Sequence, residues 1–280
     1  MDPIAAATRW QGMSDRSPRD GTVDELKAAD ATSVHRAVRE EGEDELARPA
    51  AALLWSGLAA GIAISASLVA EAALQVHLPD APWRTLVVSL GYPVGFLIVI
   101  LGRLQLFTES TITAMLPLAT EPSWQALRRT MRLWVLVLVA NLAGTALSGG
   151  AIALGWLGAP ELREAMIAIA TKITTLTPLA TFVNAVPAGF LIAIVAWTLP
   201  NARAQSFWVI LTIMYVVAIA GFSHSIVGSN EAWLLLFAGR ADSATVLGSV
   251  VPAIAGNLLG GAGIFALIAH AQVRSDAQGE

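Results

Sequence analysis

The amino-acid sequence predicts an all-α membrane protein with six transmembrane helices in two halves of three. The first observation is the composition: the 280 residues are 55% hydrophobic and 14% charged, and the mean hydropathy is +0.63, outside the range of an ordinary soluble domain. The second is that six stretches are long enough for the roughly 20 apolar residues that a hydrocarbon core of ~30 Å requires. The third is that polar residues interrupt two of these stretches at corresponding places.

The six predicted spans follow one another along most of the chain. The second and the fifth are too long for one simple span, which is typical of a half-helix, a loop and a second half-helix in series. We therefore predict that helices 2 and 5 are broken. The spans are expected near residues 51–74, 85–119, 131–157, 180–199, 206–238 and 245–270.

The predicted six-helix pore domain, residues 49–270, has a tail at each end. Residues 1–48 form an acidic tail that lacks the apolar central stretch of a cleavable secretory signal. Its first thirty residues combine Pro, Gly, Ser and acidic side chains, a composition typical of disorder. Residues 271–280 form the second tail, and both tails are expected to be cytoplasmic.

A short amphipathic helix is predicted inside the first tail, over residues 33–47. Val34, Val38 and Leu46 recur there among acidic side chains. We expect a solvated helix that leads into the first span; the alternative is a regulatory plug or a partner-binding helix. The formal net charge of −4 comes largely from this tail, so it gives no reason to expect a nucleic-acid partner.

The distribution of basic residues predicts the orientation, because Lys and Arg in short loops resist crossing the membrane. With both termini inside, eight basic residues near span ends lie on the inner side and four on the outer side. We therefore expect a multi-pass protein of the cell (inner or plasma) membrane with cytoplasmic termini. The inner set is Arg36, Arg39, Arg48, Arg128, Arg129, Arg132, Arg203 and Arg274, and the outer set is Arg84, Arg163, Lys172 and Arg240.

The two polar interruptions are the best indication of function. The first surrounds Thr108 and the second surrounds His224. Asn141 lies 33 positions after Thr108, and Asn257 lies 33 positions after His224. Each Asn is followed two residues later by Ala or Leu and then by Gly. Unwound backbone at membrane depth is tolerated only where it lines a cavity or is buried in protein. Broken helices at corresponding places in two halves of a membrane chain therefore predict a solute pore.

The two interruptions are expected to meet near the middle of the membrane. Three spans per half is an odd number, so the second half enters from the opposite side and the repeat is inverted. Thr108 and His224 then become neighbours. The free N–H groups and the positive ends of the following half-helices favour an anion there without a buried formal charge.

His224 is the one histidine expected at membrane depth near a break. A titratable side chain there is costly to bury and is a functional candidate by default. Its reference pKa of ~6.5 would let it pass a proton to a weak-acid anion. The alternative is a neutral imidazole that bridges Thr108 and backbone carbonyls and so holds the two loops together.

Other residues near the interruptions have a structural and a functional interpretation. Leu106, Phe107 and Phe222 could narrow the pore and force dehydration, or they could be ordinary core residues. Asn141 and Asn257 could hydrogen-bond the unpaired loop backbones, or they could belong to packing faces of small residues at four-residue spacing.

Three runs of this sequence, in this order, resemble the formate/nitrite transporter family over residues 50–270. The resemblance implies a homopentamer in which each protomer has its own pore, built from six helices in an aquaporin-like inverted repeat. It also implies passage of small monovalent anions or their conjugate acids, such as formate, nitrite or hydrosulfide. Thr108 and His224 correspond to the central pair, and Leu106, Phe107 and Phe222 to the constrictions. The runs are Leu-Phe-Thr at 106–108, Gly-Phe-Ser-His-Ser-Ile at 221–226 and Gly-Asn-Leu-Leu-Gly-Gly at 256–261.

The sequence departs from the family pattern in the fourth span. Familiar members carry an Asn near the pore, and alignment on Trp197 gives Gly189 at that position, which the nearby Asn184 does not obviously replace. Lys172 could correspond to the Lys that accompanies this Asn.

A second departure lies beside Thr108. Glu109 follows it directly and Arg103 precedes it by five residues, where well-known members carry small or uncharged residues. A bare carboxylate would repel an anion, so Glu109 must be protonated, paired with Arg103 or turned away. We expect the pair with Arg103; proton coupling through Glu109 is the alternative.

Other functions compete with an anion pore. A pore for a small neutral solute is compatible with Glu109, although the Asn-Pro-Ala signatures of water channels are absent, and a scaffold without transport is also compatible with the sequence. An enzyme is not expected, because the zinc motif His-Glu-x-x-His and the Gly-x-Ser-x-Gly elbow are missing. With no cysteine in the chain, we expect no thiolate metal site, no other metal and no cofactor. The expected partners are the small anion or its acid, the lipid bilayer and four further copies of the chain.

Overall fold

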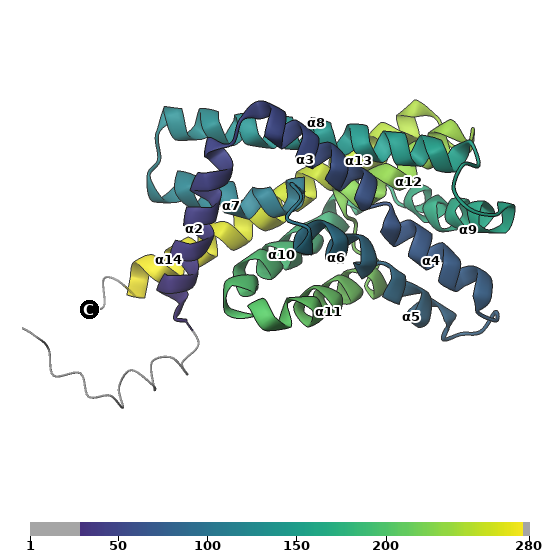
Figure 1. The fold of residues 1–280 in the computed structure, drawn as a ribbon, viewed down its shortest axis with the longest axis horizontal. Coiled ribbons are helices and arrows are strands. Elements are labelled where there is room, and N and C mark those ends of the chain that lie inside the picture. Colours follow the sequence, from purple (N-terminus) through teal and green to yellow (C-terminus); the bar gives the residue numbers. More distant parts are fainter. Residues whose placement is uncertain (1–28, 277–280) are drawn as a thin grey trace, which may run out of the picture. The chain divides into compact units, whose positions relative to one another are not determined.

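The computed structural model describes residues 29–276, and over this range it contains helices, turns and loops but no β-strand (Figure 1). The disorder predicted for the start of the chain falls almost wholly on residues 1–28, outside the described residues, as do residues 277–280 of the predicted C-terminal tail. Within the described residues, the chain from Ala31 to Asp276 forms one compact unit.

The first half of this unit begins with two helices that the sequence predicts as one span. A turn at Ile64 and Ser65 separates them, although together they reach from Ala50 to His77. The second predicted span is divided as well, because residues 102–106 are not in a helix. The helices are α3 (Ala50–Ala63), α4 (Ala66–His77), α5 (Arg84–Val88), α6 (Pro93–Leu101), α7 (Phe107–Thr120) and α8 (Trp124–Ala153).

The second half contains one helix that was not predicted, α9 (Pro160–Ala170), in the segment expected to be a loop. The fifth predicted span is again divided, at residues 220–224. The last predicted span is helical throughout but contains a π-helical stretch, Leu259–Phe265. The remaining helices are α10 (Pro178–Thr198), α11 (Ser206–Ile219), α12 (Ser225–Phe237), α13 (Ser243–Leu258) and α14 (Ala266–Asp276).

Five helical stretches within the described residues are long and apolar enough to cross a membrane, and the first of them contains the turn at Ile64 and Ser65. A sixth apolar stretch, Arg203–Ile219, is shorter, because the helix ends where the loop 220–224 begins. The structure thus has five stretches of membrane length where the sequence predicts six. The five are Ala50–His77, Arg84–Leu101, Trp124–Ala153, Pro178–Asn201 and Ser243–Ser275.

Glycines allow two helix pairs to approach closely, α3 against α8 and α10 against α13. A Cβ at Gly61 would lie 2.3 Å from the carbonyl oxygen of Asn141, and a Cβ at Gly189 would lie 2.2 Å from that of Asn257. Real Cβ atoms do not come that near to a backbone atom, so both positions require glycine in this packing. The two asparagines are thereby held against a neighbouring helix.

The helix α2 (Ala31–Ala47) covers the segment for which the sequence predicts an amphipathic helix, and it packs on α7 and α14 (Figure 1). Val34, Val38 and Leu46 are buried, and a Cβ at Gly42 would overlap the carbonyl oxygen of Thr113. The expected solvated lead-in is therefore incorrect for one face of this helix. Its apolar side chains are covered because Gly42 lets the two helices touch.

Candidate functional site

The two non-helical segments, residues 102–106 and 220–224, are each followed by a helix that begins in the same way. Leu106 and His224 are the N-cap residues of α7 and α12, with φ/ψ of −103°/127° and −108°/127°. An N-cap in extended conformation leaves the first backbone N–H groups of the helix without partners in that helix. These groups need acceptors elsewhere in the molecule.

Two asparagines from distant helices supply one such acceptor each. The side-chain oxygen Oδ1 of Asn141 accepts from the N–H of Phe107 at 2.8 Å, and Oδ1 of Asn257 accepts from the N–H of Ser225 at 2.8 Å. The Nδ2 group of Asn141 donates to the carbonyl oxygens of Gly57 and Gln105. Asn257 donates in the same manner to Ala185 and Ser223, so both side chains hold a loop and a neighbouring helix together.

These bonds define which positions of the two segments correspond. The sequence comparison matched Thr108 with His224, because each precedes its asparagine by 33 positions. In the structure the asparagines bind Phe107 and Ser225, which precede them by 34 and 32 positions. His224 therefore corresponds to Leu106 rather than to Thr108, and the equal spacing is a coincidence.

Thr108 and His224 nevertheless lie together, as predicted. The hydroxyl oxygen Oγ1 of Thr108 is 3.0 Å from Nε2 of His224, and the two residues are 1% and 3% exposed. Nδ1 of His224 accepts from the N–H of Val227 at 3.1 Å. Because Nδ1 accepts, the neutral ring carries its proton on Nε2 and donates it to Thr108. The ring of Phe96 packs edge-on at 5.0 Å between centroids.

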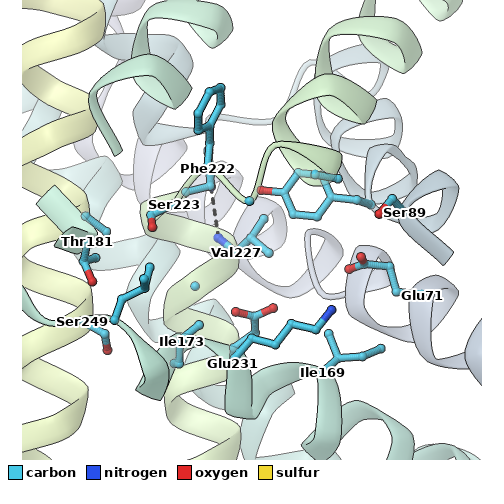
Figure 2. Close-up of a pocket in the computed structure, with 18 of the residues that line it drawn as sticks. Glu71, Ser89, Ile169, Ile173, Thr181, Phe222, Ser223, Val227, Glu231 and Ser249 are labelled. Atoms are coloured by element: carbon cyan, nitrogen blue, oxygen red, sulfur yellow. Dashed lines mark hydrogen bonds between the residues drawn. The ribbon is translucent and has the colours of Figure 1, made fainter. Parts of the chain in front are cut away.

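A pocket of about 180 Å³ opens on the His224 side of this pair (Figure 2). His224 and Phe222 line it, and so does Lys172, which the sequence analysis named. Two further lining residues, Glu71 on α4 and Glu231 on α12, were not predicted as site residues. The signal was present, because each is a carboxyl side chain within a predicted membrane span.

A larger cavity of about 850 Å³ lies between α2 and the segment that leads into α7. Its charged lining contains five carboxyl and three guanidinium groups, so it is acidic. Glu109 and Arg103 both line it. The charged residues are Glu40, Glu41, Asp44, Glu45, Arg48, Arg103, Glu109 and Arg203.

The predicted ion pair between Arg103 and Glu109 is wrong. Arg103 instead binds Glu41 of α2, with 2.7 Å between Nη2 and Oε1. Its backbone has a φ of 51° at the end of α6, and the side chain meets α2 rather than the first turn of α7. Within residues 29–276 Glu109 forms no ion pair or hydrogen bond through its side chain.

Gln105 connects α2 to the loop before α7 and was not predicted as a site residue. Its Nε2 group donates to Glu45 at 2.7 Å and to Ser110 at 2.9 Å, and its Oε1 accepts from Arg48 at 2.6 Å. Glu45 also accepts from the hydroxyl of Thr113 at 2.5 Å. Burial raises the pKa of the Glu45 carboxyl, against the opposing effect of these hydrogen bonds.

The predicted constriction residues lie in different surroundings. Leu106 and Phe107 are 1% and 2% exposed and belong to the largest apolar cluster of the described residues. Phe222 is half-buried and lines the smaller pocket, and Figure 2 shows it beside Ser223. Gly189, where the resemblance predicts an Asn, lies against Asn257, and this packing has no room for a side chain.

Comparison with known proteins gives a consistent result. A family model described as formate/nitrite transporter matches residues 32–271. The inner membrane protein YfdC of Escherichia coli (strain K12) is 40% identical over 247 residues, which cover 88% of this chain and 80% of that protein. The uncharacterized transporter YrhG of Bacillus subtilis (strain 168) is 25% identical over 245 residues, 84% of this chain and 90% of that one.

Two solved structures share the fold. One is described as a pentameric formate channel with formate bound; its TM-score is 0.70 at 18% identity, with 81% of this chain and 98% of that chain covered. The other is described as an FNT family ion channel, with a TM-score of 0.67 at 18% identity, covering 88% of this chain and 96% of that one.

Proposed function

Because this chain belongs to the formate/nitrite transporter family, we propose that it is a membrane channel or transporter for small monovalent weak-acid anions of the formate and nitrite kind. The observation that carries the proposal is the hydrogen bond between Thr108, in the first turn of α7, and His224, the N-cap residue of α12. The smaller pocket begins at His224, and the larger cavity reaches Glu109, next to Thr108.

The proposed architecture is the inverted repeat of six spans with the second and fifth broken, assembled as a homopentamer. The matched hydrogen bonds of Asn141 and Asn257 support the repeat, as do the matched contacts of Gly61 and Gly189. The match to a structure described as pentameric supports the assembly. We further propose an inner-membrane location with both termini cytoplasmic.

The site offers hydrogen-bond donors to an anion. Neither Thr108 nor neutral His224 carries a fixed positive charge. His224 donates from Nε2 to Thr108, so the Thr108 hydroxyl is free to donate its own proton to a solute oxygen. Both α7 and α12 begin here, and helix N-termini favour negative charge. Leu106, Phe107 and Phe222 would strip water from the solute on its way.

His224 is proposed to assist proton transfer. The hydrogen bonds of its ring define what must change when the ring takes up a second proton. An imidazolium needs a proton on Nδ1, and Nδ1 is occupied as the acceptor for the N–H of Val227. Protonation therefore breaks the cap of α12 and turns the ring into a donor at both nitrogens. A ring that returns its extra proton to the solute restores the cap.

Uptake into proteoliposomes tests the proposed function. Purified protein should accelerate the entry of ¹³C-formate or nitrite, and the rate should rise as the external pH falls below neutrality. Protein-free vesicles correct for leakage of the neutral acid. Flux no greater than in those vesicles over the whole pH range would contradict the proposal.

A pore for a small neutral solute is the second candidate. The five carboxyl groups of the larger cavity favour it, because carboxylates beside the path repel anions. Entry of urea or glycerol that is independent of pH, with no entry of formate, would support this candidate. Protein that moves neither solute would indicate a scaffold without transport.

A further inference from the structure

The start of α8 carries three arginines that the proposed function does not use. Arg128, Arg129 and Arg132, the arginine cluster, are exposed, and none of them forms an ion pair within residues 29–276. Arg132 donates from Nη2 to the backbone carbonyl oxygen of Arg48 at 3.2 Å, which occupies one of its five N–H donors. The remaining donors of the arginine cluster are available to a ligand outside the chain.

The electric field at the arginine cluster is positive. α8 begins at Trp124, and its first turn contains no acidic residue. The backbone N–H groups at the start of a helix carry partial positive charge, so they add to the charge of the arginines. Glu121 is the acidic residue closest to the cluster in sequence, and it is exposed and forms no ion pair in the part of the chain that the structure describes. An anion is therefore the ligand that this surface favours.

The length of α8 places the arginine cluster at the depth of the lipid headgroups. α8 has 30 residues and is about 45 Å long, whereas a hydrocarbon core is about 30 Å thick. Residues 133–153 contain no charged side chain and are long enough to fill that core. The rise from Arg132 back to Arg128 is about 6 Å, close to the thickness of one headgroup layer. The three guanidinium groups thus lie where phospholipids carry their phosphates.

An exposed apolar stripe begins beside the arginine cluster and continues along α8, which runs along one edge of the fold in Figure 1. Its side chains recur at intervals of four or eight residues, so they share one side of the helix, and they are between 36% and 60% exposed. Arg128 and Arg132 directly follow the first two of them and border the stripe. The apolar stripe consists of Leu127, Met131, Val135, Val139 and Leu147.

Two tryptophans give independent evidence for this depth. Trp124 lies one turn before Arg128, and Trp55 lies near the start of α3, the helix that follows Arg48 and packs against α8. The two side chains are 79% and 72% exposed. Trp is enriched where the hydrocarbon meets the headgroups, because its ring is apolar and its N–H hydrogen-bonds to the polar layer. Both tryptophans thus indicate that this end of α8 lies at the membrane surface.

We propose that the arginine cluster binds the phosphate of an anionic phospholipid and that the acyl chains of this lipid lie along the apolar stripe of α8. Guanidinium groups bind phosphate oxygens through pairs of N–H groups, and basic residues at the end of a membrane span attract anionic lipids. A zwitterionic lipid carries a positive group beside its phosphate, so the positive field favours phosphatidylglycerol over phosphatidylcholine. The lipid site is separate from the Thr108–His224 pair and does not depend on which solute crosses the membrane.

Competition between two lipids tests the proposal. Purified protein in a neutral detergent is mixed with equal amounts of phosphatidylglycerol and phosphatidylcholine that have the same acyl chains, and native mass spectrometry counts the lipids that stay bound. We expect the wild-type protein to retain more phosphatidylglycerol. Arg128→Gln, Arg129→Gln or Arg132→Gln should each lower the ratio of the two bound lipids about fivefold, and the triple variant should lower it further.

Arg274→Gln is the matched control, because Arg274 is an exposed arginine of α14 that forms no ion pair among the described residues. This variant removes the same charge from another helix and should keep the wild-type ratio. Arg132→Lys keeps the charge but loses the paired N–H groups, so it should lower the ratio less than Arg132→Gln does. The Lys variant also keeps the inference testable if the Gln variants fail to fold.

The soluble headgroup glycerophosphoglycerol distinguishes a lipid from a free phosphate ester. At the concentration of the lipid it should not displace bound phosphatidylglycerol, because it makes no contact with the apolar stripe. Complete displacement would overturn the lipid as the ligand. Equal retention of the two lipids by wild-type protein, or a wild-type ratio in the triple variant, would overturn the proposal as well. None of these measurements uses solute flux, so they are independent of the proposed function.

Discussion

The hydroxyl oxygen of Thr108 lies 3.0 Å from Nε2 of His224, across 116 positions of sequence. The imidazole is fixed on its other side by the N–H of Val227, so the orientation of the ring and its proton position are set together. A change at either residue therefore alters the hydrogen-bond donors of this pair.

His224→Asn should change the pH profile of anion flux and leave the assembly intact, because the amide cannot take a proton near neutral pH.

Thr108→Val should lower flux at every pH, since it removes the hydroxyl, and Thr108→Ser should keep most of it. Uptake between pH 5 and pH 8, with gel filtration of each variant, measures both. A His224→Asn protein of normal size with the wild-type pH profile would refute the proton role.

Asn257→Ala should lower the free energy of unfolding by about 1–3 kcal/mol, the cost of leaving a buried N–H without an acceptor. Three hydrogen bonds are lost, to Ser225, Ala185 and Ser223. Thermal unfolding in detergent measures the loss. Asn184→Ala is the control, because Asn184 contributes only its backbone carbonyl to the same loop.

Gly189→Ala should prevent the native packing of α10 on α13, because its Cβ would lie 2.2 Å from the carbonyl oxygen of Asn257. We expect loss of stability of about 1–3 kcal/mol or more, and a displaced Asn257 that reduces flux. Gly248→Ala tests the same helix pair where a Cβ would lie 3.6 Å from Pro178, an ordinary contact. Equal melting temperatures for the two variants would contradict this account of Gly189.

The docking of α2 should weaken as pH rises, because of Glu45. Burial raises the pKa of this carboxyl in the docked helix above its ordinary value. The docked state is therefore favoured fully below the ordinary pKa, and this contribution is lost as pH rises through the raised value. Glu45→Gln should abolish this weakening at rising pH, and Glu40→Gln, an exposed change on the same helix, should not. The loss of docking at acid pH that follows from the lowered pKa of buried His35 should remain in both variants.

Spin labels measure this docking directly, since the chain has no cysteine and accepts a pair of introduced ones. One label on the exposed face of α2 and one on α8 report the separation of the helices across pH. A separation that does not change between pH 4 and pH 9 in the protein with Glu45 would contradict the prediction.

Glu109→Gln tests whether the carboxylate beside Thr108 limits anion flux. Because Glu109 has no ion-pair partner within residues 29–276, its replacement should raise formate uptake above neutral pH, where repulsion of the anion is greatest. Arg103→Ala, which breaks an exposed pair with Glu41, should change stability by less than about 1 kcal/mol. An unchanged uptake rate in Glu109→Gln would show that this carboxylate is incidental.

The sequence was sufficient for the all-helical membrane class and for the contact between Thr108 and His224. Helix content and family follow from local composition and from short motifs, and both can be recognised without coordinates. Thr108 and His224 were also predicted to meet, because an odd number of spans per half implies an inverted repeat. The register between the two segments was not predicted correctly, because the hydrogen bonds of Asn141 and Asn257 define it and spacing does not.

Only the tertiary structure determined which charged side chains lie close to one another. Arg103 could have paired with Glu109 by sequence distance, but the turn at the end of α6 brings it to Glu41. Glu71, Lys172 and Glu231 come together only because α4, α9 and α12 pack side by side. Apolar patterns and motifs are local properties that a sequence displays directly. The partner of a charged side chain depends on how distant helices cross, which no local pattern contains.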